Sequence, residues 1–437
     1  MTTHFPTHKK TLPPPQIPTQ TGPDNIRWDF NNGARILFPD NEKTYAYRIE
    51  NSDTRLVIIM GTHKPEKPDP TDESDKSHKE GEKRLYQTKQ KYHMPLSIRV
   101  WELLKNGQYE EKISVQNTLK NRKVLIQFPR GALGDTLAWF PYAAAFTREH
   151  QCKTTIVMPA HISDIYRKTH PHIIFADPDP NDTEFRKKFF ASYRVALFYN
   201  DHENCHQPRD FRITGLASTA RNILDLSNVH DPIPPDPTIK AKKTDTPYVC
   251  IGTQSTMQAK YWNNPNGWKE VISFLKKSGY RVISIDRNYV AGHTSPNKNP
   301  TYNYIPNGCE DETGNRPLSE RIAWLRGAAF FIGLSSGLSW LAKACDTPTI
   351  MISGFTDPSN EFEADARIWS PIPCNSCWND RTITFDPRNY HWCPRHENTH
   401  RAWECSRFIT AHQVISAITN LPAYKETAPQ PQEIPDE

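Results

Sequence analysis

The sequence predicts an α/β protein with two Rossmann-like domains that follow a small β-rich domain. Short apolar runs typical of buried strands alternate with helical patterns in two separate series. A segment rich in proline and lysine, residues 229–247, separates the two series and has the composition of a linker. Strands that alternate with helices predict parallel sheets, and the two series predict two domains with a cleft between them.

The N-terminal quarter of the chain has a different pattern. Residues 1–25 are rich in proline and threonine, and we expect them to be disordered. Residues 26–120 contain the alternating segments TYAYRIE, TRLVIIM, LSIRVWEL and EKISVQN, which are typical of half-buried strands and predict the β-rich domain. Residues 63–84 form a charged insert that we expect to be a mobile loop.

The first Rossmann-like domain is expected over residues 121–240. Its strands are predicted at VLIQF, TTIVM and RVALFY (194–199), and its first helix at TLAWFPYAAAFTREH. The second domain is expected over residues 247–420, with strands at YVCIG, RVISID, AFFIG and PTIMIS. Its helices are predicted at 268–277, 319–327 and GLSWLAKAC. We expect residues 421–437 to form a disordered tail.

The composition of the chain excludes few functions, but it limits the partners and the location that we expect. The chain has 437 residues, 36% hydrophobic and 24% charged, and its net charge of +5 does not single out nucleic acid as a partner. The first residues contain no apolar leader, and the longest apolar run is too short and too polar for a membrane span. We therefore expect a cytoplasmic protein without a membrane span.

The first candidate motif is FPRGALGDTLAWFPY, where a glycine-containing turn joins a strand to a helix. Backbone N–H groups in such a turn bind anions, and the helix dipole adds to the attraction. We expect Ala132, Leu133 and Gly134 to contact such an anion. Asp135 stands at the entrance of the helix, where it either caps the helix or acts as a base toward an acceptor hydroxyl.

The second motif, TQSTMQAKYWNNPNGW, follows the first strand of the second domain. Its hydroxyls at Thr253 and Ser255 and its ammonium at Lys260 suit a diphosphate leaving group, with a solvated surface lysine as the alternative. Asp286, at the end of RVISID, joins this set of candidate binding residues.

The third motif is FFIGLSSGLSWLAKACDTPTIMISG, in which a strand ends and a second helix begins. Its anion-binding candidates are Gly333, Leu334, Ser335, Ser336 and Gly337. Glycines used only for close packing are the alternative interpretation.

Four of the nine cysteines lie close together near the C-terminus: Cys374, Cys377, Cys393 and Cys405. Their spacing predicts one closed, tetrahedral, structural metal site within a finger at residues 372–406, with zinc or iron as the metal. We expect the nearby histidines His391, His396 and His400 to lie outside the ligand set.

These residues alone indicate a two-domain transferase with two anion sites and a structural metal. The competing hypothesis is a protein that binds nucleic acid or other proteins through a four-cysteine zinc site. The charges around the cysteines are mixed rather than a basic stripe, which does not favour nucleic acid.

Taken together, the motifs resemble those of the bacterial autotransporter heptosyltransferases, relatives of the lipopolysaccharide heptosyltransferases of glycosyltransferase family 9. The resemblance is most specific at GALGDTLAW, at the Lys260 segment, at IGLSSGLSWLAKA and at the four-cysteine spacing. The lipopolysaccharide enzymes have Asp, Thr and His where this chain has Ser335, Ser336 and Trp340, so the resemblance does not extend to contacts from these side chains.

The resemblance implies a GT-B fold and transfer of heptose from ADP-heptose to serine hydroxyls on the passenger domain of an autotransporter adhesin. It further implies one cysteine-bound metal ion per chain with iron favoured over zinc, and a large ring-shaped homo-oligomer such as a dodecamer. For the reaction itself, we expect direct displacement at the anomeric carbon with Asp135 as the base, which inverts the configuration. The alternative within the same chemistry is a transferase that uses another nucleotide sugar or another acceptor, such as the lipopolysaccharide core.

Overall fold

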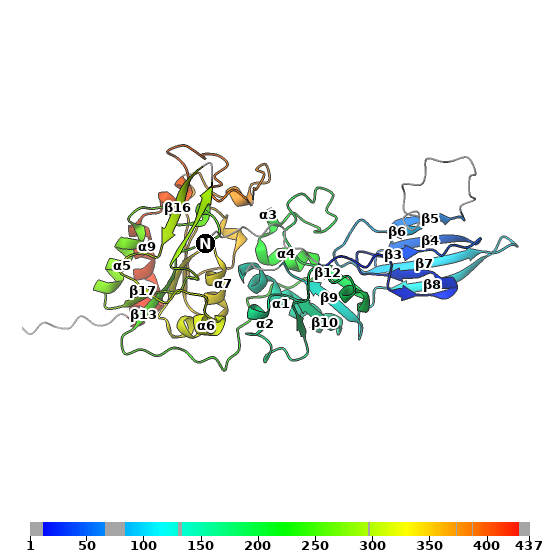
Figure 1. Cartoon of the computed structure of the whole chain (residues 1–437), viewed down its shortest axis with the longest axis horizontal. Helices are drawn as coiled ribbons and strands as arrows, with labels where there is room; N and C mark the ends of the chain where they lie inside the picture. Colours follow the sequence, from blue (N-terminus) through cyan, green and yellow to red (C-terminus); the bar gives the residue numbers. More distant parts are fainter. Residues whose placement is uncertain are drawn as a thin grey trace, which may run out of the picture.

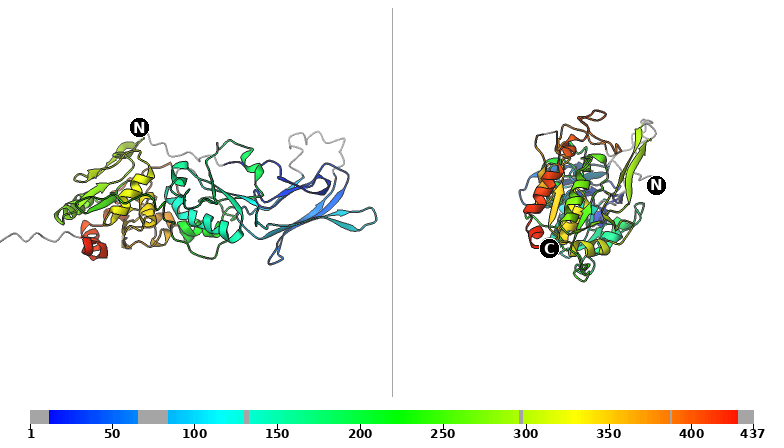
Figure 2. Two further views of the ribbon diagram at one scale, coloured as in Figure 1. Left: turned by 90° about the horizontal axis from the view of Figure 1, so that it is seen from below. Right: turned by 90° about the vertical axis from the view of Figure 1, so that its left-hand side faces the viewer.

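The computed structural model describes residues 12–65, 84–129, 133–295, 298–372, 374–386 and 388–427. Three units lie in a row along the long axis of the molecule: a β-rich domain, a first α/β domain and a second α/β domain (Figure 1). Seen from below, the molecule has the same elongated shape, and the view along its long axis shows a compact outline (Figure 2, left and right). No described helix is long and apolar enough to cross a membrane.

The β-rich domain consists of two four-stranded antiparallel sheets, β1-β2-β3-β6 and β5-β4-β7-β8. Its strands are β1 (Gln20–Thr21), β2 (Arg27–Asp29), β3 (Arg35–Leu37), β4 (Thr44–Asn51), β5 (Val57–His63), β6 (Leu85–Gln87), β7 (Leu96–Leu103) and β8 (Tyr109–Gln116). Alternation places Tyr45, Tyr47 and Ile49 of β4 in the core, as the sequence predicts. The domain therefore folds on the pattern seen in its sequence.

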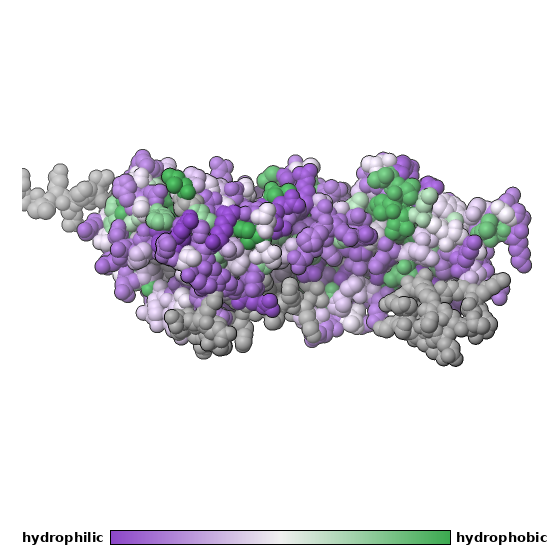
Figure 3. Space-filling view, turned by 90° about the horizontal axis from the view of Figure 1, so that it is seen from above, coloured by the Kyte–Doolittle hydropathy of each residue, from purple (hydrophilic) through white to green (hydrophobic). Residues whose placement is uncertain are grey.

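One edge of this domain carries exposed apolar side chains. Strand β5 is an edge strand, and at its start Leu56, Val57 and Met60 are exposed to solvent. Figure 3 shows apolar surface on this part of the molecule. An uncovered apolar edge strand is a surface that another protein chain covers readily.

The first α/β domain has a parallel sheet in the order β11-β10-β9-β12. Its elements are β9 (Lys123–Gln127), α1 (Leu133–His150), β10 (Lys153–Val157), α2 (Ala160–Ser163), β11 (Ile174–Ala176), β12 (Ala191–Arg194), α3 (Phe211–Thr214) and α4 (Leu216–Ile223). The strand predicted at 194–199 was wrong in position, because the pairing with β9 uses residues 191–194 and the apolar residues after Arg194 form an irregular segment.

The second α/β domain has a six-stranded parallel sheet in the order β17-β14-β13-β18-β19-β20. Its elements are β13 (Tyr248–Gly252), α5 (Gly267–Lys277), β14 (Arg281–Ser284), β15 (Val290–Ser295), β16 (Lys298–Tyr304), β17 (Glu310–Asp311), α6 (Leu318–Gly327), β18 (Phe331–Leu334), α7 (Gly337–Ala344), β19 (Thr349–Ile352), β20 (Ala366–Ile368), α8 (Glu404–Arg407), α9 (Ala411–Asn420) and α10 (Pro422–Thr427). The antiparallel hairpin β15–β16 was not predicted. Residues 229–247 contain no helix or strand, as expected of a linker.

The two ends of the chain differ from expectation. Residues 12–25 are folded rather than disordered: Leu12 packs in a small core with Leu125 and Phe189, and the Leu12 carbonyl accepts a hydrogen bond from Arg186. Extended proline-rich chain leaves its carbonyls free to accept such bonds. Helix α10 likewise begins inside the predicted tail and packs Tyr424 on Tyr280. Residues 1–11 and 428–437, and 66–83 of the charged insert, lie outside the described residues.

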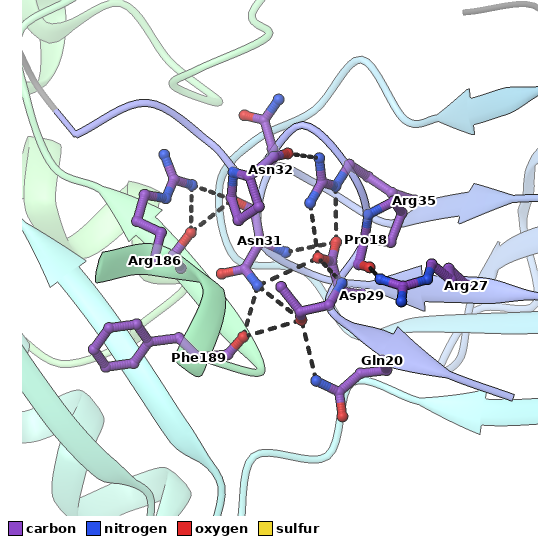
Figure 4. Close-up of polar contacts among 12 residues, drawn as sticks. Pro18, Gln20, Arg27, Asp29, Asn31, Asn32, Arg35, Arg186 and Phe189 are labelled. Carbon is purple, nitrogen blue, oxygen red and sulfur yellow. Dashed lines mark hydrogen bonds and ion pairs between the residues drawn. The ribbon is translucent and has the colours of Figure 1, made fainter. Parts of the chain in front are cut away.

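A buried polar network joins the β-rich domain to the first α/β domain (Figure 4). Arg35 donates to both carboxylate oxygens of Asp29, at 2.8 and 2.7 Å, and the two side chains are 2% and 0% exposed. Asn31 donates to the Phe189 carbonyl at 2.6 Å, and Arg186 donates to the Asn31 carbonyl. The charged groups at this junction bind partners inside the protein, so we expect the junction to be rigid.

Candidate active site

The site lies where the first turns of two helices from different domains meet. A Cβ atom on Gly337, the first residue of α7, would lie 2.8 Å from the Leu133 Cβ and 3.0 Å from the Gly134 nitrogen of α1. A Cβ on Gly134 would lie 3.3 Å from the Gly337 Cα. The two α/β domains thus contact each other through glycines, and any larger side chain would push them apart.

Asp135 lies in the first turn of α1, next to this contact. It is inside the helix rather than before it, so it does not occupy the cap position that the sequence left open. Burial raises the pKa of the Asp135 carboxyl above its usual value, and the positive charge of Lys260 partly opposes that rise. Among the described residues, no hydrogen-bond donor occupies the carboxylate, which leaves it free to accept a proton from a ligand.

Lys260, in the short turn after β13, supplies the opposite charge from the second domain. Burial lowers the pKa of its ammonium, and the carboxylates of Asp135 and Glu361 act in the opposite direction. The Lys260 side chain is half-buried rather than fully solvated. The ammonium lies 5.6 Å from the centre of the Phe355 ring and 5.8 Å from that of Trp378.

Glu361 is a site residue that no pattern in the sequence indicates. Its carboxylate is 2% exposed, forms an ion pair with Arg367 at 2.6 Å and accepts the Ser335 hydroxyl at 2.5 Å. Ser335, predicted as a binding residue, is thus held by Glu361. An acidic residue in an irregular segment has no local signal that would show it facing Lys260.

Thr253 and Asp286 lie together at the ends of the neighbouring strands β13 and β14. Asp286 accepts hydrogen bonds from the Thr253 nitrogen and hydroxyl, both at 2.8 Å, and from the Gln254 nitrogen at 3.1 Å. Burial raises the pKa of Asp286, and these hydrogen bonds oppose the rise. The pair therefore shapes the loop after β13 and has little capacity left for a ligand.

Two polar atoms near these strand ends lack partners among the described residues. They are the Gln254 amide nitrogen, in the loop after β13, and the Ser336 hydroxyl, before α7. Since β13 and β18 are parallel neighbours, both loops emerge at the same edge of the sheet, where Ser255 also lies. Buried polar atoms without partners suit a polar ligand, and Gln254 had not been predicted.

The remaining predicted binding residues differ in how the structure places them. Gly333 and Leu334 are buried in β18, where a Cβ on Gly333 would lie 2.4 Å from the Phe331 ring. Their environment is that of core packing. Ala132 lies outside the described residues.

The four cysteines of the finger come together. Cys377, Cys393 and Cys405 line one small cavity, and the pKa of Cys405 is raised by burial and by the proximity of the other three thiols, Cys374 included. Burial and Cys374 also raise the pKa of Cys377 to about 12. Sulfur atoms gathered around a cavity fit a thiolate-bound metal, because a cation offsets the repulsion among the thiolates.

A second donor set shares one of these cysteines. The side chains of Cys374, His396 and Glu404 also lie close enough to hold an ion together. The Glu404 carboxylate, however, is paired with Arg401 at 2.6 Å and accepts the Cys374 backbone N–H at 3.2 Å. These contacts favour Glu404 as a support for the Cys374 backbone and the four thiols as the ligands.

Comparisons with known proteins agree with this geometry. The model of glycosyltransferase family 9 (heptosyltransferase) matches residues 225–369. The chain is 41% identical to the autotransporter heptosyltransferase BAHTCr of Citrobacter rodentium, over 94% of this chain and 93% of the relative. It is 33% identical to BimC of Burkholderia thailandensis, over 95% of this chain and 90% of the relative, and BimC is named an inactive autotransporter heptosyltransferase.

The fold also matches a solved structure. TibC from enterotoxigenic Escherichia coli H10407 is described as an iron-containing dodecameric glycosyltransferase, and its structure gives a TM-score of 0.83 at 40% identity. The structure of TibC in complex with ADP-D-β-D-heptose gives 0.82 at 39% identity. Each comparison covers 94% of this chain and 99% of the solved one.

Proposed function

The chain belongs to the autotransporter heptosyltransferases, and we propose that it is an inverting enzyme that transfers heptose from ADP-heptose to serine hydroxyls on the passenger domain of an autotransporter adhesin. One observation carries the proposal: Asp135 of the first domain and Lys260 of the second lie close enough to shift each other's pKa, where α1 meets α7. One relative is named inactive, so similarity alone does not decide activity, and these residues of the chain itself carry the proposal.

In the proposed reaction, the Asp135 carboxylate accepts the proton of the acceptor hydroxyl while the hydroxyl oxygen attacks the anomeric carbon of the heptose. The bond from that carbon to the diphosphate breaks in the same step. Lys260 stabilises the departing diphosphate, and Ser255, Gln254 and Ser336 offer further polar contacts. A single displacement of this kind inverts the anomeric configuration. Thr253 and Asp286 act by holding the loop in place.

We assign one structural iron ion per chain to Cys374, Cys377, Cys393 and Cys405. Four thiolates fill a tetrahedral site and leave no position for substrate, so the metal stabilises the finger rather than the reaction. Elemental analysis of protein purified without an affinity tag should find about one ion per chain. Iron gives a coloured thiolate complex, and zinc is colourless. Metal-free protein with full activity and normal stability would contradict the assignment.

We further propose a large ring-shaped oligomer of the dodecameric kind described for TibC, supported by the similarity over 94% of the chain. Light scattering of the purified protein measures this directly. A monomer at micromolar concentration would contradict it.

Intact-mass measurement of a passenger fragment tests the reaction itself. The fragment is incubated with the enzyme and ADP-heptose, ADP-glucose or UDP-glucose, with Asp135→Asn as the control enzyme. The expected result is a mass increase in steps of one heptose, only with ADP-heptose and only with the wild-type enzyme, with the sugars on serine. Product NMR then reports the anomeric configuration. Transfer of another sugar would favour the alternative donor, and no transfer from any donor would reject the proposal.

A further inference from the structure

The cysteine finger reaches both α/β domains. On the second domain, the Ser376 nitrogen donates to the Gly354 carbonyl at 2.9 Å. On the first domain, the Asn379 amide donates to the Arg212 carbonyl at 2.8 Å, and Arg381 pairs with Asp210 at 3.3 Å. The finger therefore spans the junction at which Asp135 and Lys260 meet.

Trp378, next to Cys377, occupies the centre of this span. Its ring packs on aromatic rings of both domains, with centroids 5.6 Å from Phe211 and 5.6 Å from Phe355. Its indole N–H donates to the Asn360 amide oxygen at 3.2 Å, and its backbone N–H donates to the Phe355 carbonyl at 3.3 Å. The indole is thus fixed in one orientation.

The same indole holds the Lys260 ammonium. The rings of Trp378 and Phe355 lie 5.8 and 5.6 Å from it and contribute cation–π attraction. Within the described parts of the chain, the three N–H donors of this half-buried side chain have no hydrogen-bond partner. Ring faces can orient a charge without occupying its donors, so the ammonium stays available for an anionic ligand.

We infer that Trp378 is a positioning residue that connects the metal-bound finger to Lys260 and so sets the ammonium against the donor diphosphate. This inference rests on the proposed function. It assigns the finger a part in the reaction although its metal is structural. Phe355 supports Lys260 from the second domain alone, whereas Trp378 makes its position depend on the finger.

Three variants of the full chain test the inference. Trp378→Leu keeps an apolar side chain but removes the ring face, and Trp378→Phe restores a ring. Phe385→Leu is the matched control, because Phe385 packs on Trp378 at 5.0 Å but is not among the rings described around Lys260. The measurements are metal per chain, thermal unfolding, kcat, KM for ADP-heptose and for the acceptor fragment, and the affinity for ADP by calorimetry.

We expect Trp378→Leu to lower kcat per metal-loaded chain roughly 3- to 30-fold, the range for loss of one cation–π contact, with a smaller change in KM for the acceptor fragment. Trp378→Phe should recover most of the loss, and Phe385→Leu should stay near the wild type. In a Lys260→Ala background, Trp378→Leu should add little, because Trp378 acts through Lys260.

A purely structural Trp378 predicts otherwise. Equal losses in Trp378→Leu and Phe385→Leu, or a full additional loss in the Lys260→Ala background, would overturn the inference. So would a Trp378→Leu enzyme with wild-type kcat per metal-loaded chain. A wild-type chain that binds ADP but transfers no heptose would instead contradict the proposed function.

Discussion

The chain has two interdomain junctions, and they use charge in opposite ways. Between the β-rich domain and the first α/β domain, Asp29 and Arg35 are buried and bound to each other. Between the two α/β domains, Asp135 and Lys260 are half-buried and attract each other, but neither has a hydrogen bond to another described residue through its charged group. A buried charge that is fully hydrogen-bonded holds structure, whereas one without hydrogen bonds is costly unless a ligand uses it. We call the junction at Asp29 and Arg35 the structural joint and the junction at Asp135 and Lys260 the chemical joint.

The largest expected effect belongs to the chemical joint. Asp135→Asn removes the base but keeps the volume of the side chain, so transfer should fall about 10²- to 10⁴-fold. Thermal unfolding should change little, because the substitution removes a buried charge without creating a cavity. Turnover with ADP-heptose and the unfolding midpoint are measured on the same preparation. Near-normal transfer would mean that Asp135 is only a helix residue.

At the structural joint we expect the opposite result, a loss of stability with an unchanged kcat. Arg35→Met leaves the Asp29 carboxylate buried without its partner, which costs about 3–5 kcal/mol of unfolding free energy. Lys89→Met is the matched control in the same joint, because Lys89 and Glu203 pair at 2.8 Å while both are exposed. Urea unfolding should separate the two variants clearly. For the chains that remain folded, kcat should match the wild type; a lost kcat in Arg35→Met at full folding would erase the distinction between the joints.

Lys260→Ala, also at the chemical joint, should lower transfer less than Asp135→Asn does. Loss of one preorganised charge at the diphosphate should lower turnover on the order of 10²-fold. Lys269→Ala changes an exposed lysine of the same domain and should leave turnover unchanged. Steady-state kinetics with ADP-heptose provide the measurement. If the two variants behave alike, Lys260 does not contact the donor.

The sequence predicted the scaffold better than the contacts across it. The apolar runs at VLIQF and YVCIG form central strands, and α1 begins within the predicted motif at Leu133, because local pattern decides strands and helices. Asp135 and Lys260 were each selected for their chemistry, but their meeting depends on how two domains pack. Glu361 and Trp378 were missed for the same reason.

The differences between expectation and structure have equally physical causes. Thr253 and Asp286 were selected as ligand contacts, which stays a prediction, and adjacent strand ends also let them bind each other. Residues 12–25 have the composition of a disordered segment. They are nevertheless held in place, because the buried side chains of Arg186 and Arg35 donate hydrogen bonds to carbonyls of this segment. These contacts depend on residues that are distant in the sequence, and local composition does not reveal them.

The pH dependence of transfer gives the finest test of the chemical joint. Asp135 must be ionised to act as a base, so activity is lost as pH falls through its pKa, which burial raises. Lys260 must be protonated, so activity is also lost as pH rises through its pKa, which burial lowers. The profile of kcat/KM should therefore be a bell that is narrower than ordinary aspartate and lysine would give.

The two limbs should also be coupled. Lys260 lowers the pKa of Asp135, so the residual activity of Lys260→Ala should lose its acid limb at a higher pH than the wild type does. Lys260→Arg keeps the positive charge and should leave the acid limb near its wild-type position. Because only a charge is removed, the shift is measurable while the fold is unchanged. An acid limb that stays in place in Lys260→Ala would show that the two groups do not interact, and the joint would then lack the feature that distinguishes it from the one at Asp29 and Arg35.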